Sequence, residues 1–349
     1  MQAINDLPKL RPRYEEGPQQ LHAFKLLKEV CSLMKRRAFL GLLSATTASA
    51  LAPIASANTT LRTVGAGLSP APVSSSDASS DDVVRFIVFG DSGKGDTAQH
   101  ELARMMVAHH WDRSYDMALM LGDNIYPSGD MEDMPSKFER PYAELLKRGV
   151  SFHAALGNHD VKKGREAQIN YRNFNMGGRS YYSFTRGDGL VEFFALDSTY
   201  FNLRQRRWLE EALQASQAKW KIAFFHHPLY SSADRHGSKL ELRAELEPLL
   251  VRYGVDAAFS GHDHVYERIK PQQGVQYFVS GAGSKPRRGD LERESPIFAA
   301  GNDENSSFIS IEVTPERFDF KTIDATGKVI DSGELASRAA RARHLTEQV

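Results

Sequence analysis

Five apolar runs of this chain end in a polar residue that can bind a metal ion. The runs FIVF, ALML and AAL are followed by Gly90-Asp91, Gly122-Asp123 and Gly157-Asn158, and the runs AFF and AAFS by His226 and Gly261-His262. In open α/β sheets, ligands bind beyond the carboxyl ends of the strands. Five such ends in one chain therefore predict one shared site.

The apolar patterning predicts strands that alternate with helices. Strands are expected at 83–89, 115–121, 151–156, 190–196, 220–225 and 256–260, and helices at 97–110, 135–148, 204–216 and 239–253. Such alternation indicates a sheet covered by helices on both faces. The later runs 276–280, 307–313 and 317–323 follow one another with little helix. They predict a second, more antiparallel sheet.

Composition narrows the class of protein. The chain has 349 residues, 41% of them hydrophobic, which is ample for one large core. Its formal net charge is zero, so no broad basic field favours nucleic acid or an anionic membrane surface. We therefore expect no nucleic-acid partner and no stable membrane insertion. The only cysteine is Cys31, which excludes an internal disulfide.

The stretch from Met34, MKRRAFLGLLSATTASALAPIASA, resembles an export signal. It has a basic start with Arg36 and Arg37, a weakly apolar centre and small residues at its end. The adjacent arginines are typical of the twin-arginine class, whose export machinery is then an expected partner. The alternative is a transmembrane anchor. Removing residues 1–57 takes eight of the 44 basic and four of the 44 acidic residues, leaving a net charge of −4 and no cysteine.

We predict five segments along the chain. Residues 1–33 are expected to be a mis-assigned extension before the true start, 34–57 a twin-arginine signal, 58–80 a flexible linker, 81–335 the catalytic domain and 336–349 a C-terminal tail. An exported protein without disulfides agrees with folding before export, and the expected location is the periplasm or the medium.

Together the five turns carry a specific set of motifs. They read GDSG (90–93), GDNIY (122–126), GNHD (157–160), AFFH (223–226) and GHDH (261–264). This set resembles the calcineurin-type metallophosphoesterases, and in particular the small single-domain purple acid phosphatases. The resemblance covers about residues 83–330. It implies an α+β fold of αββα type, in which two mixed β-sheets pack face to face with helices on the outer faces.

The resemblance implies a dinuclear metal centre. Asp91, Tyr126, His264 and the bridging Asp123 would hold Fe(III), for which a phenolate is a suitable hard anionic ligand. Asn158, His226, His262 and the same Asp123 would hold a divalent ion, which Fe, Zn or Mn could supply. His226 is preferred to His227 because the family's ligand stands two residues before a proline. The three anionic ligands supply a charge of −3 against the +5 of Fe(III) and a divalent ion. The site would therefore keep a net positive charge, which attracts a phosphate dianion.

The implied activity is that of an acid phosphatase, which hydrolyses small phosphate monoesters with a metal-activated hydroxide as the nucleophile. His159 is the first candidate for protonating the leaving oxygen, and His236 is the second. Asp160 is expected to orient His159 or, equally, to cap a turn. A phosphodiesterase or nuclease of the same superfamily remains an alternative, as does a non-hydrolytic iron redox protein.

Overall fold

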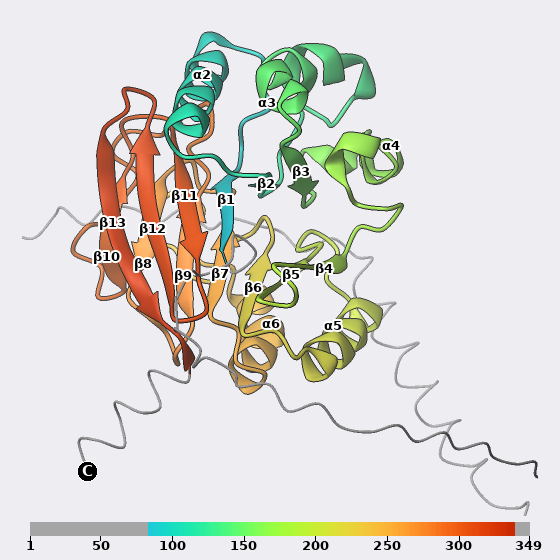
Figure 1. Cartoon of the computed structure of the whole chain (residues 1–349), viewed down its shortest axis with the longest axis vertical. Helices are drawn as coiled ribbons and strands as arrows, with labels where there is room; N and C mark the ends of the chain where they lie inside the picture. Colours follow the sequence, from blue (N-terminus) through green and yellow to red (C-terminus); the bar gives the residue numbers. More distant parts are fainter. Residues whose placement is uncertain (1–82, 339–349) are drawn as a thin grey trace, which may run out of the picture. The chain divides into compact units, whose positions relative to one another are not determined.

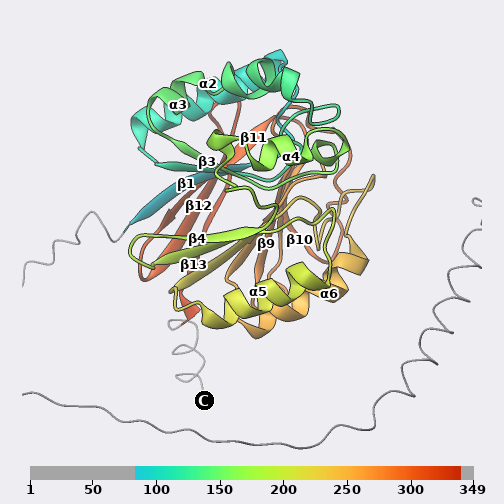
Figure 2. The same cartoon turned by 90° about the vertical axis from the view of Figure 1, so that its right-hand side faces the viewer.

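The computed structural model describes residues 83–338, which form two mixed β-sheets with helices on their outer faces. Figures 1 and 2 show the two sheets between a pair of helices on one side, α2 and α3, and a pair on the other, α5 and α6. The predicted fold class is therefore confirmed. The predicted segments 1–33, 34–57 and 58–80 lie outside the described residues.

The first sheet has six strands in the order β13-β12-β11-β1-β2-β3. Its strands are β1 (Val84–Phe89), β2 (Met117–Met120), β3 (Ser151–Ala154), β11 (Ser307–Val313), β12 (Arg317–Asp324) and β13 (Val329–Ala336). β1, β2 and β3 run parallel, whereas β11, β12 and β13 are antiparallel neighbours. β13 includes Ala336, the first residue of the predicted tail.

The second sheet has seven strands in the order β10-β8-β9-β7-β6-β5-β4. Its strands are β4 (Tyr182–Arg186), β5 (Val191–Ala195), β6 (Trp220–Phe224), β7 (Ala257–Ser260), β8 (Tyr266–Ile269), β9 (Gln276–Ser280) and β10 (Phe298–Asn302). β5, β6, β7 and β9 are parallel, and the other pairings are antiparallel.

The prediction of a separate, antiparallel C-terminal sheet is wrong. The run 276–280 is β9 and pairs in parallel with β7, while 307–313 and 317–323 form β11 and β12 and extend the sheet of β1. The apolar runs from the first half of the chain likewise divide between the two sheets. Local periodicity predicts that a segment is a strand, but it does not state which partner the strand pairs with.

Aromatic and aliphatic side chains fill the space between the sheets. Phe86 of β1 meets Phe193 of β5 edge to face, with ring centroids 5.1 Å apart, and both are fully buried. Burying side chains of this size contributes about 1.5–3 kcal/mol each. This contact fixes the two sheets face to face, and with them the strand ends that each sheet brings to the site.

The helices cover the outer faces. α2 spans Thr97–Asp112, α5 Leu203–Ala215 and α6 Leu240–Arg252, while α3 (Ala143–Lys147) and α4 (Arg165–Ile169) are short. Leu209 and Leu213 of α5 and Leu246 of α6 pack in one apolar cluster against the second sheet. Among residues 83–338, no helix combines the length and the apolar character needed to cross a membrane.

The predicted single helix 135–148 is wrong, because it is interrupted. A π-helix at Pro135–Glu139 is followed by turns and then by α3. Pro141 has no N–H to donate to the carbonyl of Lys137, as an α-helix would require. That carbonyl instead accepts a hydrogen bond of 2.6 Å from Gln99 Nε2 on α2. The interruption thus allows a hydrogen bond between α2 and the π-helix.

Candidate metal centre

Five turns at the carboxyl ends of parallel strands form the centre. β1, β2 and β3 of the first sheet lead to Asp91, Asp123 and Asn158, and β6 and β7 of the second lead to His226 and His262. The backbone N–H of His262 donates to Asp91 Oδ2 at 2.8 Å. This bond crosses from one sheet to the other. The shared site predicted from the sequence is therefore present, although it lies between two sheets and not at the edge of one.

Three of the predicted ligands have a left-handed backbone. The φ angles are 56° at Asp91, 52° at Asp123 and 71° at His262. This conformation is uncommon for residues other than glycine, and such strain concentrates at functional sites. It turns each side chain sharply away from the direction of the strand before it.

Two glycines are required by close approach. A Cβ atom at Gly157 would overlap Asp123 Oδ1, and one at Gly261 would overlap Asp91 Oδ2. Each carboxylate therefore packs directly against the backbone of another turn. These two glycines keep the carboxylates of Asp91 and Asp123 in the centre.

One half of the centre combines a phenol, a carboxylate and an imidazole. Tyr126 Oη donates to Asp91 Oδ1 at 3.0 Å and lies 3.2 Å from His264 Nε2. His264 Nε2 is 3.6 Å from Asp91 Oδ1. The three atoms thus lie within 3.6 Å of one another, and their binding of a ferric ion stays a prediction.

The other half combines two imidazoles and an amide oxygen. His226 Nε2 lies 3.0 Å from Asn158 Oδ1, 3.2 Å from His262 Nδ1 and 3.6 Å from Asp123 Oδ1. His226 Nδ1 donates to the carbonyl of Leu121 at 2.9 Å, which leaves Nε2 with a free lone pair. A hydrogen bond of this kind fixes the tautomer and ring orientation of a metal-binding histidine.

The two halves are contiguous. The ligand atoms of Asp91, Asp123 and His226 all lie within 4.8 Å of one another, and all three residues are buried. Asp123 therefore lies beside ligand atoms of both halves, and its bridging of two metal ions stays a prediction.

The electrostatics of the centre suit bound cations. Burial and the neighbouring Asp123 raise the pKa of Asp91 well above its ordinary value. Burial lowers the pKa of His264 to about 4 and also lowers that of His262, so both imidazoles are neutral and available as ligands. A set of crowded carboxylates, neutral imidazoles, an amide oxygen and a phenol fits a hard trivalent ion beside a divalent one.

His159 and His236 lie at the open side of the centre. The ring of His159 is 4.7 Å from the ring of Tyr126, and its Nδ1 donates to the carbonyl of Pro127 at 2.7 Å. The ring of His236 is 4.5 Å from that of His262. Both side chains can therefore meet a molecule that enters the centre from solvent.

Asp160 does not contact the His159 ring, so the expectation that it orients this ring is wrong. Its Oδ1 accepts the N–H of Ile125 at 3.0 Å, and its Oδ2 accepts those of Asn124 at 3.0 Å and Gly157 at 2.8 Å. Burial and Asp123 raise its pKa to about 7 against these hydrogen bonds. Asp160 instead ties the turn of Tyr126 to the turn of Asn158, and the carbonyl of Pro127 orients His159.

The sequence reasoning missed the role of Ser198 and set His227 aside. Ser198 Oγ accepts the N–H of His226 at 3.2 Å and of His227 at 2.9 Å, and lies 3.0 Å from His227 Nδ1. The ring of His227 is 4.5 Å from that of His262. The pair HHP before Leu229 was the available signal for His227, whereas nothing local marked Ser198.

The sequence of this chain is similar to those of known proteins. A sequence profile described as calcineurin-like phosphoesterase matches residues 84–266. "Purple acid phosphatase 17" of Arabidopsis thaliana is 30% identical over 245 residues, which cover 61% of this chain and 72% of the relative. "Tartrate-resistant acid phosphatase type 5" of Homo sapiens is 27% identical over 299 residues, covering 73% and 92%.

Two solved structures share the fold. Purple acid phosphatase PPD1 from yellow lupin seeds gives a TM-score of 0.63 at 19% identity, covering 73% of this chain and 54% of that one. GAP50, titled as the anchor in the inner membrane complex of Plasmodium, gives 0.64 at 22% identity, covering 73% and 89%. At these identities the likeness concerns the fold alone.

The fold and the centre define a metal-dependent phosphoesterase. The chain belongs to the calcineurin-like phosphoesterase family, and it is of the purple acid phosphatase type. It is accordingly an acid phosphatase.

Proposed function

We propose that the protein hydrolyses phosphate monoesters at a dinuclear Fe(III)–M(II) centre. The observation that carries this proposal is the contact of Tyr126 Oη with both Asp91 Oδ1 and His264 Nε2. Burial and the two carboxylates raise the pKa of the Tyr126 phenol. Only a strongly acidic cation would convert it to a phenolate, and Fe(III) is such a cation.

The second position is less selective. Asn158, His226 and His262 are neutral ligands, so only the shared Asp123 adds charge there. Neutral nitrogen and amide ligands accept several divalent ions, and availability then decides which one binds. We propose Fe, Zn or Mn at this position.

The bound ions would neutralise charge on the phosphoryl oxygens and lower the pKa of a water molecule. The chain's own residues hold the substrate and move protons. His159 lies beside the ligand Asn158, and its Nδ1–H is held by Pro127. Its Nε2 is therefore the atom that contacts phosphate or passes a proton to the leaving oxygen.

His236 lies opposite, against the ring of His262. Burial and the nearby Arg287 and Arg235 lower the pKa of His236. We assign to it a hydrogen bond to the phosphate, and to His159 the proton for the leaving group. General acid–base catalysis by groups of this kind typically accelerates a reaction about 10²–10⁴-fold.

A rate comparison tests the preference for monoesters. We expect kcat/KM to be much larger for p-nitrophenyl phosphate than for its bis ester. A strong preference for the diester would instead identify a phosphodiesterase. An Asn158→Ala, His159→Ala double variant should lose hydrolysis, and turnover like that of the wild type would mean that the reaction occurs elsewhere.

We also propose that the protein is exported by the twin-arginine route, to the periplasm or the medium. The support is the sequence from Met34 with Arg36 and Arg37, which lies outside the described residues. Folding before export would allow iron to be bound in the cytoplasm, away from competing Zn(II) and Cu(II). Export of an Arg36→Lys, Arg37→Lys variant at the normal rate, with full metal content, would contradict this proposal.

A further inference from the structure

Two buried carboxylates, Asp263 and Glu267, lie close to the metal centre without belonging to it. Asp263 stands between two histidines in the motif GHDH (261–264), and Glu267 belongs to β8. Both residues are fully buried. The strongest effects on the pKa of the Asp263 carboxyl come from burial, which raises it, and then from Ser231, Asp290 and Glu267. None of these neighbours is a predicted metal ligand, so the two carboxylates belong to a separate polar cluster.

This cluster has a surplus of negative charge. Around Asp263, Glu267 and Asp290 are acidic and Arg287 is cationic. Arg287 already pairs with Asp290, since its Nη1 lies 3.2 Å from Asp290 Oδ2. Among residues 83–338, no Lys, Arg or His side chain pairs with Asp263 or Glu267. A buried charge without a partner is strongly destabilising, and the cluster contains two.

Three oxygen atoms of the cluster lack a hydrogen bond. Both carboxylate oxygens of Asp263 and the hydroxyl oxygen of Ser232 are buried and have no partner among residues 83–338. The backbone N–H of Ser232 donates to Glu267 Oε1 at 3.2 Å and to Oε2 at 2.9 Å. Burial raises the pKa of Glu267 and the nearby Ser232 hydroxyl opposes this rise, although it makes no hydrogen bond of regular geometry. Buried polar atoms are nearly always bonded, so these three point to a ligand that binds them.

The chemistry of the cluster favours a divalent cation as this ligand. A single proton would neutralise only one of the two carboxylates and would leave the Ser232 hydroxyl without a partner. A water molecule could bond the oxygens, but it carries no charge. A divalent cation offsets both charges. It also binds oxygens that do not bond one another, because each of them stands about 2.3–2.6 Å from the ion.

We propose that Asp263, Glu267 and Ser232 bind a calcium ion, at a site separate from the dinuclear centre. All three offer oxygen atoms, which hard cations prefer. Calcium is favoured over magnesium because it accepts irregular geometry, whereas magnesium demands a regular octahedron and keeps several water molecules. With two carboxylates alone, the Kd should be about 10⁻⁴–10⁻³ M, as in extracellular calcium modules. Protein purified without calcium then carries only the ions of the dinuclear centre.

The calcium ion would join three segments at the metal centre. Ser232 belongs to the loop between β6 and α6, which also carries His236. Asp263 lies in the turn after β7, next to two predicted metal ligands, and Glu267 lies on β8. On its other side the loop is held by the N–H of Glu292, which donates to the carbonyl of Ser232 at 3.0 Å. Calcium would therefore fix the loop of His236 against the metal-binding turn.

Thermal unfolding of the enzyme purified without calcium tests the site. Calcium chloride at about 10 mM, at least about tenfold above the expected Kd, should raise Tm by about 3–10 °C. Titration calorimetry should find one calcium ion per chain. Magnesium chloride at the same concentration controls for ionic strength and should have little effect on Tm. Neither measurement depends on phosphatase activity.

Variants distinguish this site from the dinuclear centre. Glu267→Gln and Asp263→Asn should each abolish the rise in Tm with calcium. Ser232→Ala removes only a hydroxyl that has no hydrogen bond, so it should fold like the wild type and weaken calcium binding about 10-fold. The matched control is Asp234→Asn in the same loop, whose exposed side chain lies outside the cluster and which should respond to calcium like the wild type.

Three results would overturn the proposal. The first is an unchanged Tm of the wild type in calcium. The second is an equal rise in magnesium chloride, which would show an effect of ionic strength. The third is a rise in Tm that Glu267→Gln and Ser232→Ala retain in full, because calcium would then bind elsewhere, for example at the dinuclear centre.

Discussion

Replacing Asp303 by asparagine should destabilise the fold and loosen the segment that carries His236. The side chain of Asp303 is only 3% exposed. Its Oδ2 accepts backbone N–H groups of Gly289 at 2.8 Å, Asp290 at 3.1 Å and Leu291 at 3.4 Å. Its Oδ1 accepts from Arg293 at 2.9 Å. One carboxylate therefore fixes the whole turn 289–293.

That turn is bonded to the segment before α6. The carbonyl of Asp290 accepts the N–H of Asp234 at 2.8 Å, and its Oδ1 accepts that of Arg235 at 3.0 Å. His236 is the next residue. The position of His236 against His262 thus depends on Asp303, although these two side chains do not touch Asp303.

The expected loss in the free energy of unfolding follows from the hydrogen bonds that Asp303→Asn weakens. An asparagine of the same shape keeps one oxygen, which can still accept from the backbone but without charge. Hydrogen bonds to charged groups contribute about 1.5–3 kcal/mol and neutral ones about 0.5–1.5, so the two shorter amide bonds lose about 2 kcal/mol together. Arg293 is half exposed, so its pair adds less than about 1 kcal/mol. Asp303→Asn should therefore lower the free energy of unfolding by about 2–3 kcal/mol.

The loss should depend on pH. Burial alone would raise the pKa of Asp303, but the hydrogen bonds from Arg293 and the backbone outweigh it and lower the pKa below its ordinary value. A lowered pKa in the folded state means that the stabilisation is fully present above the unfolded pKa of about 3.9. It disappears as the pH falls through the lower folded value. The difference between wild type and variant should therefore be constant between pH 5 and 8, on the order of 2–3 kcal/mol, and shrink in stronger acid.

Urea unfolding at pH 7, at pH 5 and in stronger acid measures this difference. The control is Asp234→Asn, whose exposed side chain has no hydrogen-bond partner among residues 83–338 and which should cost less than about 0.5 kcal/mol. The reasoning is refuted if Asp303→Asn costs as little as the control at pH 7, or if its cost grows as the pH falls.

Three further outcomes are expected. Gly157→Ala, whose Cβ would overlap Asp123 Oδ1, should purify with fewer than two metal ions per chain by elemental analysis. Gly274→Ala strains a backbone of φ 84° in the turn between β8 and β9, but its Cβ meets nothing within 4 Å, so this variant should keep both ions. His159→Ala should lower kcat about 10²-fold or more for an alkyl phosphate and far less for p-nitrophenyl phosphate, whose leaving group needs little protonation; equal losses would contradict the assigned proton transfer. Stripping the metals with a chelator should lower the melting temperature, because the crowded Asp91 and Asp123 then lack cations, and an unchanged value would contradict their convergence on a metal.

The sequence predicted the metal centre well because its signals are local. Each ligand of the two halves follows an apolar run directly or stands within a few residues of one, and Gly157 and Gly261 precede two of them. The strands β4, β8, β10 and β13 were missed. β13 is exposed along most of its length, so it has no apolar alternation to detect. Its antiparallel pairing with β12 becomes apparent only in the three-dimensional structure.

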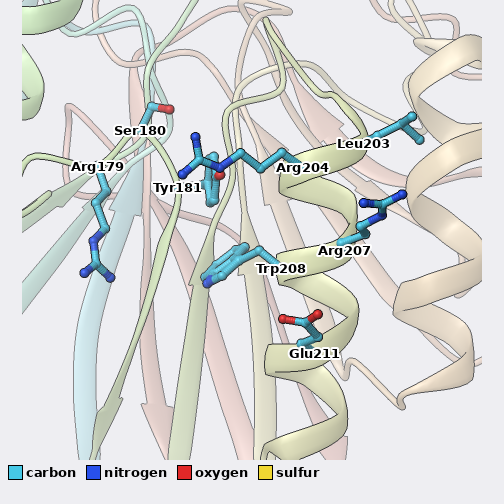
Figure 3. A pocket seen from close by; sticks show the side chains of 8 residues that line it. All are labelled: Arg179, Ser180, Tyr181, Leu203, Arg204, Arg207, Trp208 and Glu211. Carbon is cyan, nitrogen blue, oxygen red and sulfur yellow. The ribbon is translucent and has the colours of Figure 1, made fainter. Parts of the chain in front are cut away.

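Other features depend on contacts between distant segments. Asp160 bonds backbone groups some 35 residues away, at Asn124 and Ile125, which no local motif shows. Pairing of β9 with β7 and of β11 with β1 is likewise decided by packing and not by pattern. A groove lined by Arg179, Tyr181, Arg204 and Trp208 (Figure 3) brings together residues 179–181 and 203–211, and neither segment has a motif.

The most direct test is a visible absorption spectrum of the purified protein together with metal analysis. The account predicts about two metal ions per chain, at least one of them iron, and a broad visible band of tyrosinate-to-ferric charge transfer that Tyr126→Phe abolishes. A colourless protein with a single metal ion and full phosphatase activity would contradict it.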